Sequence, residues 1–479
     1  MVPSSSCRGR WPSIAGVAAC LLLVSASAHA ADVTQVATAL EEDKPVEAFF
    51  SIAYEYTAKR AAIKREWELA STTGGIGTFK DLRYARDRHA IRLRGEVGIL
   101  WDMALHVEAP IVVSDTRTLS FDQGLGSSCV YPDQIPAGST EAPNCVNEQN
   151  SSTLRDGIVP GQFGAKDTPH GFDAQNGGAM FAAGDPTVFR GPKRYGLESL
   201  NIGLDWAVLN QRKDDTKPTW VLSAELRFAL GTPMRFDRAV PGANTSVNDG
   251  VHWVQLGTTI SKRWTVVEPY ASYYWLYPLY VRDDSQFQNY RAGQKDWRPQ
   301  QRAGSYFGFE AIPWENAQQH QRISIDVRGY IEAHFQGRGY SEIWEMLSGS
   351  PALDPQPEPS GGAGQSLMRG GPPGTTAYPG VTDIENFFSY GGQLGLNVRV
   401  GRYMKFRGAF GVAGAQKHFI TFADAGKDVN ASGQVDQHGA AAEAEVNPIH
   451  RPLIDFVGRR YVVDETAIYS LFLQGMVVF

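Results

Sequence analysis

The sequence predicts an all-β transmembrane protein, an antiparallel up-and-down β-barrel of about twelve strands. Three observations predict this fold class. Segments of about ten residues alternate apolar and polar side chains, the connections between them alternate in length, and no window after residue 30 approaches the roughly 18 consecutive apolar residues of a spanning helix. With 42% hydrophobic and 20% charged residues, the chain is neither a helical membrane bundle nor a disordered protein.

Residues 1–30 have the organisation of a cleavable signal peptide. Arg8 and Arg10 form a positive region, residues 14–24 form an apolar stretch, and residues 28–30 form an Ala-x-Ala cleavage site. A lipoprotein-type cleavage before Cys20 is the alternative, but the apolar stretch continues beyond it. We therefore expect a short periplasmic segment at residues 31–46, followed by the barrel at residues 47–479. The formal net charge of -6 argues against nucleic acid as a partner.

The alternating segments are the predicted strands, and their even number suits a barrel that crosses the membrane and returns. In chain order they are residues 47–57, 87–98, 103–113, 199–209, 220–230, 251–262, 266–277, 305–312, 322–335, 388–400, 404–415 and 467–479.

The predicted connections separate by parity, as expected of a barrel with short periplasmic turns and long outer loops. Short connections follow the even strands, at residues 99–102, 210–219, 263–265, 313–321 and 401–403. Long connections follow the odd strands, at residues 58–86, 114–198, 231–250, 278–304, 336–387 and 416–466. The stretch 351–376 is rich in Pro and Gly, so we expect a flexible loop there.

The last strand carries the most specific pattern in the chain. Its apolar residues occupy alternate positions and end on an aromatic residue at the carboxyl terminus: Tyr469, Leu471, Leu473, Val477 and Phe479. This strand resembles the terminal strand of bacterial outer-membrane β-barrel proteins, the porin-like superfamily. The resemblance implies an integral outer-membrane protein that contacts outer-membrane lipids and whose closing strand is read by the barrel-insertion machinery.

The alternation also predicts which side chains face the lumen. On the third strand Leu105 and Val107 face lipid, whereas His106 and Glu108 face inward. Applied to every strand, the same sorting gives eight basic and eight acidic inward residues. The residues predicted to form the solute pathway are Arg92, Arg94, Glu96, Asp205, Arg227, Arg322, Asp326, Arg328, Arg399 and Arg407.

Two interpretations of this charged wall remain open. The charges face water in an open pore, or they pair with one another and fill the interior. Inward glycines, including Gly98, Gly203 and Gly308, favour open space. The connection 114–198 is long enough to enter the lumen as a constriction, and it contains Cys129 and Cys145. We expect these two cysteines to form a disulfide in an oxidising compartment, whether the loop enters the lumen or stays at the surface.

The sequence favours a porin-like channel for passive transport of small polar solutes. The alternative is a non-conducting barrel that displays its loops for adhesion or assembly. An enzyme is not expected: no His is followed two residues later by Ser, and the inward pair His106 and Glu108 is more typical of a polar network. No cofactor motif is present, and a calcium-like stretch from Asp428 lacks its closing Glu. An oligomer is possible, because a subunit seam is as apolar as a lipid-facing wall.

Overall fold

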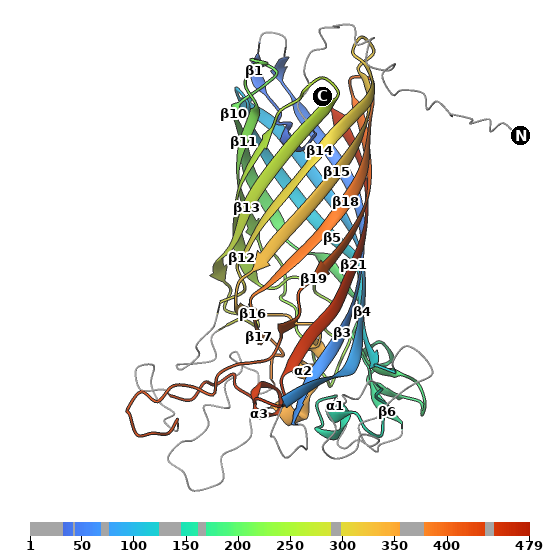
Figure 1. Cartoon of the computed structure of the whole chain (residues 1–479), viewed down its shortest axis with the longest axis vertical. Helices are drawn as coiled ribbons and strands as arrows, with labels where there is room; N and C mark the ends of the chain where they lie inside the picture. The colour runs from blue at the N-terminus through green and yellow to red at the C-terminus, as the bar shows by residue number, and fades with distance from the viewer. Residues whose placement is uncertain are drawn as a thin grey trace, which may run out of the picture.

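A computed structural model describes residues 32–41, 44–68, 76–123, 145–160, 169–288, 298–354, 378–435 and 445–479. Within them, twelve antiparallel strands form a closed barrel (Figure 1). In chain order they are β3 (Ala48–Glu68), β4 (Ile76–Leu100), β5 (Met103–Phe121), β10 (Leu200–Leu209), β11 (Thr219–Phe228), β12 (Val251–Ser261), β13 (Val267–Val281), β14 (Arg302–Asn316), β15 (Gln321–His334), β18 (Phe387–Val400), β19 (Met404–Ala415) and β21 (Tyr461–Val478). The predicted twelve-stranded all-β barrel is confirmed.

The last strand closes the wall. β21 pairs with β19 on one side and with β3 on the other, so that Leu471 lies opposite both Phe410 and Tyr56. Tyr469, Leu471, Leu473 and Phe479 are exposed on the outer surface, as their alternation predicts. Recognition of this strand by the insertion machinery stays a prediction.

The outer face of the barrel is apolar. Leu105 and Val107 are exposed, whereas His106 and Glu108, which alternate with them, are buried inside the barrel. The same alternation repeats on β15, where Ile323 is exposed beside a buried luminal neighbour. Among the described residues, no helix is long and apolar enough to cross a membrane. A closed wall leaves no unpaired strand edge in lipid, so the protein is an integral protein of the bacterial outer membrane.

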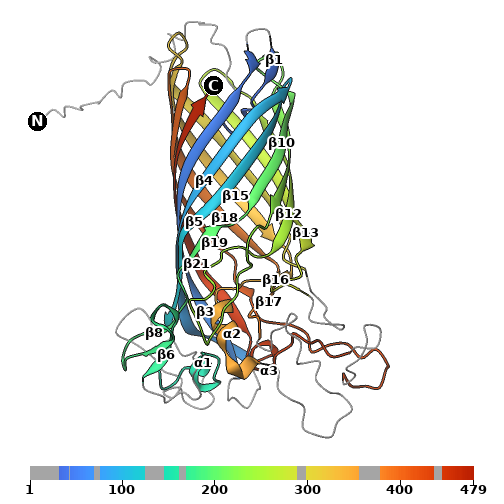
Figure 2. The same ribbon diagram turned by 180° about the vertical axis from the view of Figure 1, so that it is seen from behind.

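The barrel has two distinct ends. We call the end that carries the short connections, the C-terminus and the first described residues the turn end, and the opposite end the loop end (Figures 1 and 2). At the turn end Trp101, Trp264, Tyr403 and Phe479 are among the most exposed side chains. Aromatic side chains of this kind collect where the bilayer meets water.

Four strands extend beyond the wall at the loop end, where the sequence predicted connections: β3, β4, β5 and β21, which begins at Tyr461 and pairs there with β3. Residues 58–86 were expected to form a long loop, but β3 continues to Glu68 and β4 already begins at Ile76. β5 likewise continues to Phe121, so the next connection starts after that residue. The apolar side chains of these extensions pack into a protein core instead of facing lipid. These segments therefore have no lipid-facing apolar side, which is the feature by which a membrane strand is recognised in a sequence.

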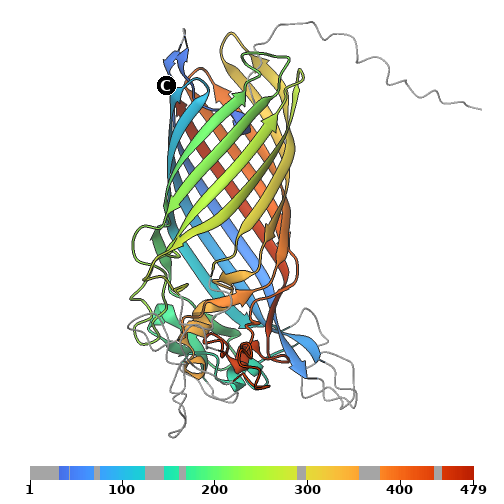
Figure 3. The same cartoon turned by 90° about the vertical axis from the view of Figure 1, so that its left-hand side faces the viewer.

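The strand extensions carry a hydrophobic core of their own. Ile63, Leu82 and Phe121 pack there with Leu154 and with Trp344. The elements gathered around this core are α1 (Ser152–Arg155), β6 (His170–Asp173), η3 (Ala174–Asn176), β7 (Ala179–Phe181), β8 (Thr187–Arg190), β9 (Arg194–Leu197), α2 (Trp344–Gly349), η4 (Pro351–Leu353), β20 (His418–Phe419) and α3 (Pro452–Asp455). Figure 3 shows this folded layer below the wall.

A cap lies at the loop-end opening. We define the cap as residues 337–349, which include β16 (Gly337–Gly339) and α2, together with β17 (Thr382–Ile384), which pairs with β16 (Figures 1 and 2). All six residues of α2 are buried. Arg194 beside β5 forms a buried ion pair with Glu345 of α2 at 2.5 Å. The cap therefore comes from the connection between β15 and β18, and not from residues 114–198, for which a place in the lumen and a place at the surface were both left open by the sequence.

The described parts of residues 114–198 lie against the wall. β8 and β9 both pair with β5, and α1 packs into the loop-end core. Cys145 is buried, but Cys129 lies outside the described residues, so their disulfide stays a prediction. The signal peptide at residues 1–30 and most of the stretch 351–376 also lie outside the described residues.

Candidate functional site

The N-terminal segment enters the barrel at the turn end. It comprises η1 (Asp32–Thr34) and leads to the small hairpin of β1 (Ala39–Glu41) and β2 (Lys44–Val46). Residues 31–46 were expected to lie outside the barrel. Instead, Thr34 Oγ1 lies 2.8 Å from Ser261 Oγ on β12, and the Ala37 N–H donates to Glu96 Oε1 at 3.0 Å. We call residues 33–39 the plug segment.

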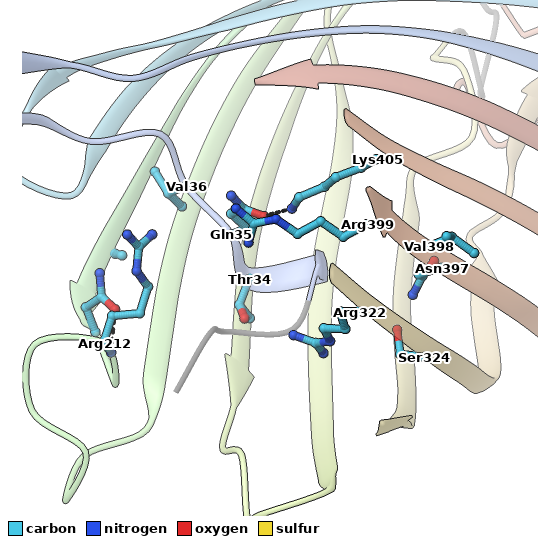
Figure 4. Close-up of a pocket in the computed structure, with 12 residues that line it drawn as sticks. Thr34, Gln35, Val36, Arg212, Arg322, Ser324, Asn397, Val398, Arg399 and Lys405 are labelled. Atoms are coloured by element: carbon cyan, nitrogen blue, oxygen red, sulfur yellow. Dashed lines mark hydrogen bonds between the residues drawn. The ribbon is translucent and has the colours of Figure 1, made fainter. Parts of the chain in front are cut away.

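A second set of contacts holds the plug segment from the opposite wall. Lys405 of β19 donates to the side-chain oxygen of Gln35, as Figure 4 shows. A small cavity of about 30 Å³ remains beside this contact, lined in part by Arg322 and Arg399. Arg322 is held by Glu310 at 2.8 Å, and Arg399 Nε donates to the carbonyl of Gly401 at 3.3 Å. These two pathway candidates therefore lie next to the plug segment.

Five other pathway candidates join one charged network on β4, β5, β10 and β11. Arg92 pairs with Glu55 at 2.9 Å and with Glu108 at 3.4 Å. Arg94 pairs with Glu96 at 3.0 Å and with Asp205 at 3.1 Å. Each arginine thus touches two carboxylates, which keeps its charge compensated in the half-buried lumen.

His106 links the remaining members of this network. Its ring nitrogens lie 2.7 Å from Asp205 and 3.1 Å from Glu225, and Glu225 also accepts from Arg227 at 2.7 Å. The pair of His106 with Glu108 that the sequence allowed is not formed, because two carboxylates on neighbouring strands hold the imidazole instead.

A second network lies on β13, β15 and β19. Asp326 accepts from Arg407 at 2.7 Å and from Arg328 at 3.2 Å, and Tyr270 donates to the same carboxylate. Arg328 also donates to the Tyr270 hydroxyl at 3.0 Å. A cavity of about 360 Å³ is lined by residues of both networks, Arg94 and Arg407 among them, and by Gln35 of the plug segment. We call it the inner chamber.

The inward glycines make room for side chains and for the plug segment. An ideal Cβ on Gly203 would lie 2.4 Å from His106 Nε2, and one on Gly308 would lie 2.7 Å from the Tyr270 hydroxyl. Gly98 faces the backbone of Thr38 in the same way. The expectation that these glycines leave open space is therefore wrong at these three positions. They allow polar groups to pack closely across the lumen.

A larger chamber of about 490 Å³ lies toward the loop end, and we call it the outer chamber. Arg92, Glu108 and Arg227 line it from the wall, and Arg338 and Tyr340 line it from the cap.

Most arginines of the outer chamber lie outside the residues predicted for the pathway. Arg86 is the last residue of the stretch that was predicted as a loop, whereas Arg88 lies inside the predicted strand 87–98. Both occupy even positions, as Arg92 and Arg94 do, but their neighbours Asp87 and His89 are polar, so the apolar alternation of a membrane strand does not mark them. Arg302 begins β14, three residues before the predicted start of that strand. Arg338 lies in the cap, and no local pattern in the sequence marks it.

No family model and no curated protein matches the sequence. Among solved structures, an outer-membrane channel from Pseudomonas putida F1 is similar, with a TM-score of 0.35 and 9% identity over 91% of this chain and 96% of that one. A Pseudomonas aeruginosa FadL homologue has a TM-score of 0.29 and 8% identity over 91% and 90%. The protease OmpT from Escherichia coli has a TM-score of 0.26 and 6% identity over 91% and 96%. All three TM-scores are below 0.5, so the fold assignment rests on the closed strand pairing of this chain.

Proposed function

We propose that the protein is a gated outer-membrane channel for the passive passage of small polar solutes. The observation that carries this proposal is the series of cavities inside the barrel. The outer chamber, the inner chamber and the small cavity beside Gln35 are all lined by charged side chains of the wall. A barrel that served only as a support would have no need of chambers of about 490 and 360 Å³.

The plug segment is the proposed gate. Residues 33–39 touch β4, β12 and β19, three strands of the wall that are not neighbours of one another. A few hydrogen bonds hold the segment, each with a net stability of about 1 kcal/mol, so its release costs far less than opening the wall. Release of the plug segment would join the inner chamber to the periplasm.

The charged networks supply the proposed pathway. Paired arginines and carboxylates present both donors and acceptors to a passing polar solute, which exchanges one set of hydrogen bonds for another along the wall. Asp205 and Arg94 line the inner chamber at this level. We propose no catalytic role for His106, because it is buried between two carboxylates with its ring nitrogens already engaged.

The folded layer at the loop end supports a second candidate function, the display of a surface for adhesion or assembly. Its core is larger than a set of surface loops needs, and Phe456 and Val457 are exposed beside a cavity of about 560 Å³. Deletion of residues 355–376 separates the two candidates. The channel predicts unchanged conductance after the deletion, whereas display predicts loss of partner binding.

Conductance in a planar bilayer tests the proposed channel directly. Purified full-length protein should give discrete current steps, because release of the plug segment opens one continuous path. Heat-denatured protein at the same concentration is the control for detergent leak. Absence of steps from correctly folded barrels would contradict the channel function.

A further inference from the structure

The outer chamber has two chemically different sides. Arginines of β4, β5 and β11 line one side, among them Arg92 and Arg227. Trp253 of β12 and Leu276 of β13 line the other side with Tyr340 of the cap, and all three belong to or pack on one apolar cluster. A ligand that fits both sides carries a charged group on an apolar body.

The charged side has an excess of positive charge. Among the described residues that line the outer chamber, seven are arginines and four are carboxylates. Three of those carboxylates pair with arginines: Asp115 pairs with Arg86 at 2.7 Å and with Arg117 at 2.9 Å, Glu198 pairs with Arg88 at 2.6 Å, and Glu108 pairs with Arg92 at 3.4 Å. Glu55 and Glu225, just outside this lining, also pair with Arg92 and Arg227, and the positive field that remains inside the partly enclosed cavity attracts an anion.

Arg302 is the arginine best placed to receive that anion. Its guanidinium lies 6.0 Å from the centre of the Trp253 ring, where the two sides of the chamber meet. Asp249 and Glu332 act on it electrostatically, but no ion pair within 4.0 Å joins either of these carboxylates to it. The Trp253 ring is held in place because its indole N–H donates to Asp249 Oδ2 at 3.0 Å. When the carboxylate of such a ligand binds Arg302, the flat apolar group attached to it would lie against the indole of Trp253.

We infer that the outer chamber binds a small organic anion, a carboxylate carried on a flat apolar body, with Arg302 receiving the carboxylate and Trp253 the body. This inference rests on the proposed function, because it names the class of solute that the channel would select. A planar guanidinium binds a carboxylate through two parallel hydrogen bonds, and an aromatic face suits a flat apolar group.

Calorimetry on the full-length protein in detergent micelles tests the inference, with benzoate as the probe. Acetate lacks the apolar body and benzamide lacks the charge, and protein-free micelles correct for partition into detergent. Benzoate should bind more tightly than either comparator. Arg302→Gln should weaken benzoate binding about tenfold, the cost of one charge-assisted contact. Arg302→Lys keeps the charge and should recover part of the affinity.

Arg155→Gln is the matched control. Arg155 lies at the same end of the molecule, is exposed and does not line the outer chamber, so benzoate affinity should be unchanged. Equal affinities for benzoate and benzamide, equal affinities for benzoate and acetate, or an unchanged affinity in Arg302→Gln would each overturn the inference.

Bilayer conductance separates this inference from the proposed function. Current steps without benzoate binding would leave the channel standing and refute the anion site. Benzoate binding without current steps would support the anion site and refute the channel.

Discussion

The backbone of Thr38 occupies the space that a side chain on Gly98 would need. An ideal Cβ on Gly98 would lie 2.3 Å from the Thr38 carbonyl oxygen. The same carbonyl accepts from the Glu47 N–H at 2.9 Å, and the Gly98 N–H donates to the Glu47 carbonyl at 2.9 Å. The plug segment and the wall are therefore fitted to each other at a position where only glycine leaves enough room.

Gly98→Ala should displace the plug segment and increase channel conductance. The atoms that the added methyl group would meet belong to the backbone of Thr38, so a change of side-chain rotamer cannot make room for it. Single-channel recording checks the result. Gly95→Ala is the matched control: Gly95 lies on the same strand, and a Cβ there meets nothing within 4 Å. Equal open-state currents in the two variants would argue against the plug as a gate.

Neutralising Arg92, Arg94 and Arg407 together by Gln should shift the channel toward cations. Each of these arginines pairs with carboxylates of the wall, so their removal leaves an excess of acidic side chains along both chambers. The reversal potential in a salt gradient measures the preference.

The control for that experiment changes three exposed arginines of the loop-end layer to Gln: Arg155, Arg238 and Arg459. It removes the same number of charges from outside the lumen, so the reversal potential should stay at its original value. A triple luminal variant that also keeps the original potential would exclude this wall as the pathway.

Glu345→Gln should loosen the cap. Glu345 and Arg194 form an ion pair in which both side chains are almost fully buried, and Arg194 also lies over the Trp344 ring at 4.9 Å. Removing one charge of a buried pair costs about 3 to 5 kcal/mol, because the other charge stays buried without its partner. The cap should then be cut faster in limited proteolysis.

Lys217→Gln provides the comparison for that substitution. Lys217 pairs with Asp214 in an exposed turn at the opposite end, where water and salt screen the pair so that it contributes little to stability. Its proteolysis pattern should match that of the unaltered protein. If Glu345→Gln were cut no faster than Lys217→Gln, the buried pair would not be what holds the cap.

The loop-end layer should be more stable in acid than in base because of Asp455. Burial raises the pKa of this carboxyl from 3.8 to about 7, although the backbone N–H groups of Arg451 and Ala423 donate to its oxygens. The folded layer therefore binds the Asp455 proton more tightly than the unfolded chain does. This stabilisation is full below pH 4 and is lost as the pH rises to 7.

Limited proteolysis of the loop end between pH 5 and pH 8 measures this dependence, with the rates normalised to an unfolded substrate. Asp455→Asn has no carboxyl to titrate, so its normalised rate should vary less over the same range. A variant with the full original pH dependence would assign the effect to another group.

The wall of the barrel could be predicted because the local sequence of each membrane strand alternates between apolar side chains that face lipid and polar side chains that face the lumen. The alternation of Leu105, His106, Val107 and Glu108 indicates which side of β5 faces lipid and which side faces the lumen. The twelve strands, their order and the inward direction of the pathway residues all follow from that local rule. The rule fails where β3 and β4 extend beyond the wall, because there the apolar side faces a protein core.

The gate and the outer chamber could not be predicted because they depend on contacts between distant residues. Thr34 meets Ser261 across 227 positions of sequence, and Gln35 meets Lys405 across 370. Arg302 acquires its place through the register of β14 against β13, opposite Leu276. A local pattern contains no information about such partners, so only the closed barrel brings them together.

A reversible cross-link between the plug segment and the wall tests the central claim most directly. Thr34 Oγ1 and Ser261 Oγ are 2.8 Å apart, so the double variant Thr34→Cys and Ser261→Cys should form a disulfide that mass spectrometry can confirm. The account predicts that the cross-linked protein gives no current steps and that a reductant restores them, while each single variant conducts with and without reductant. Equal conductance of the cross-linked and the reduced double variant would contradict the account.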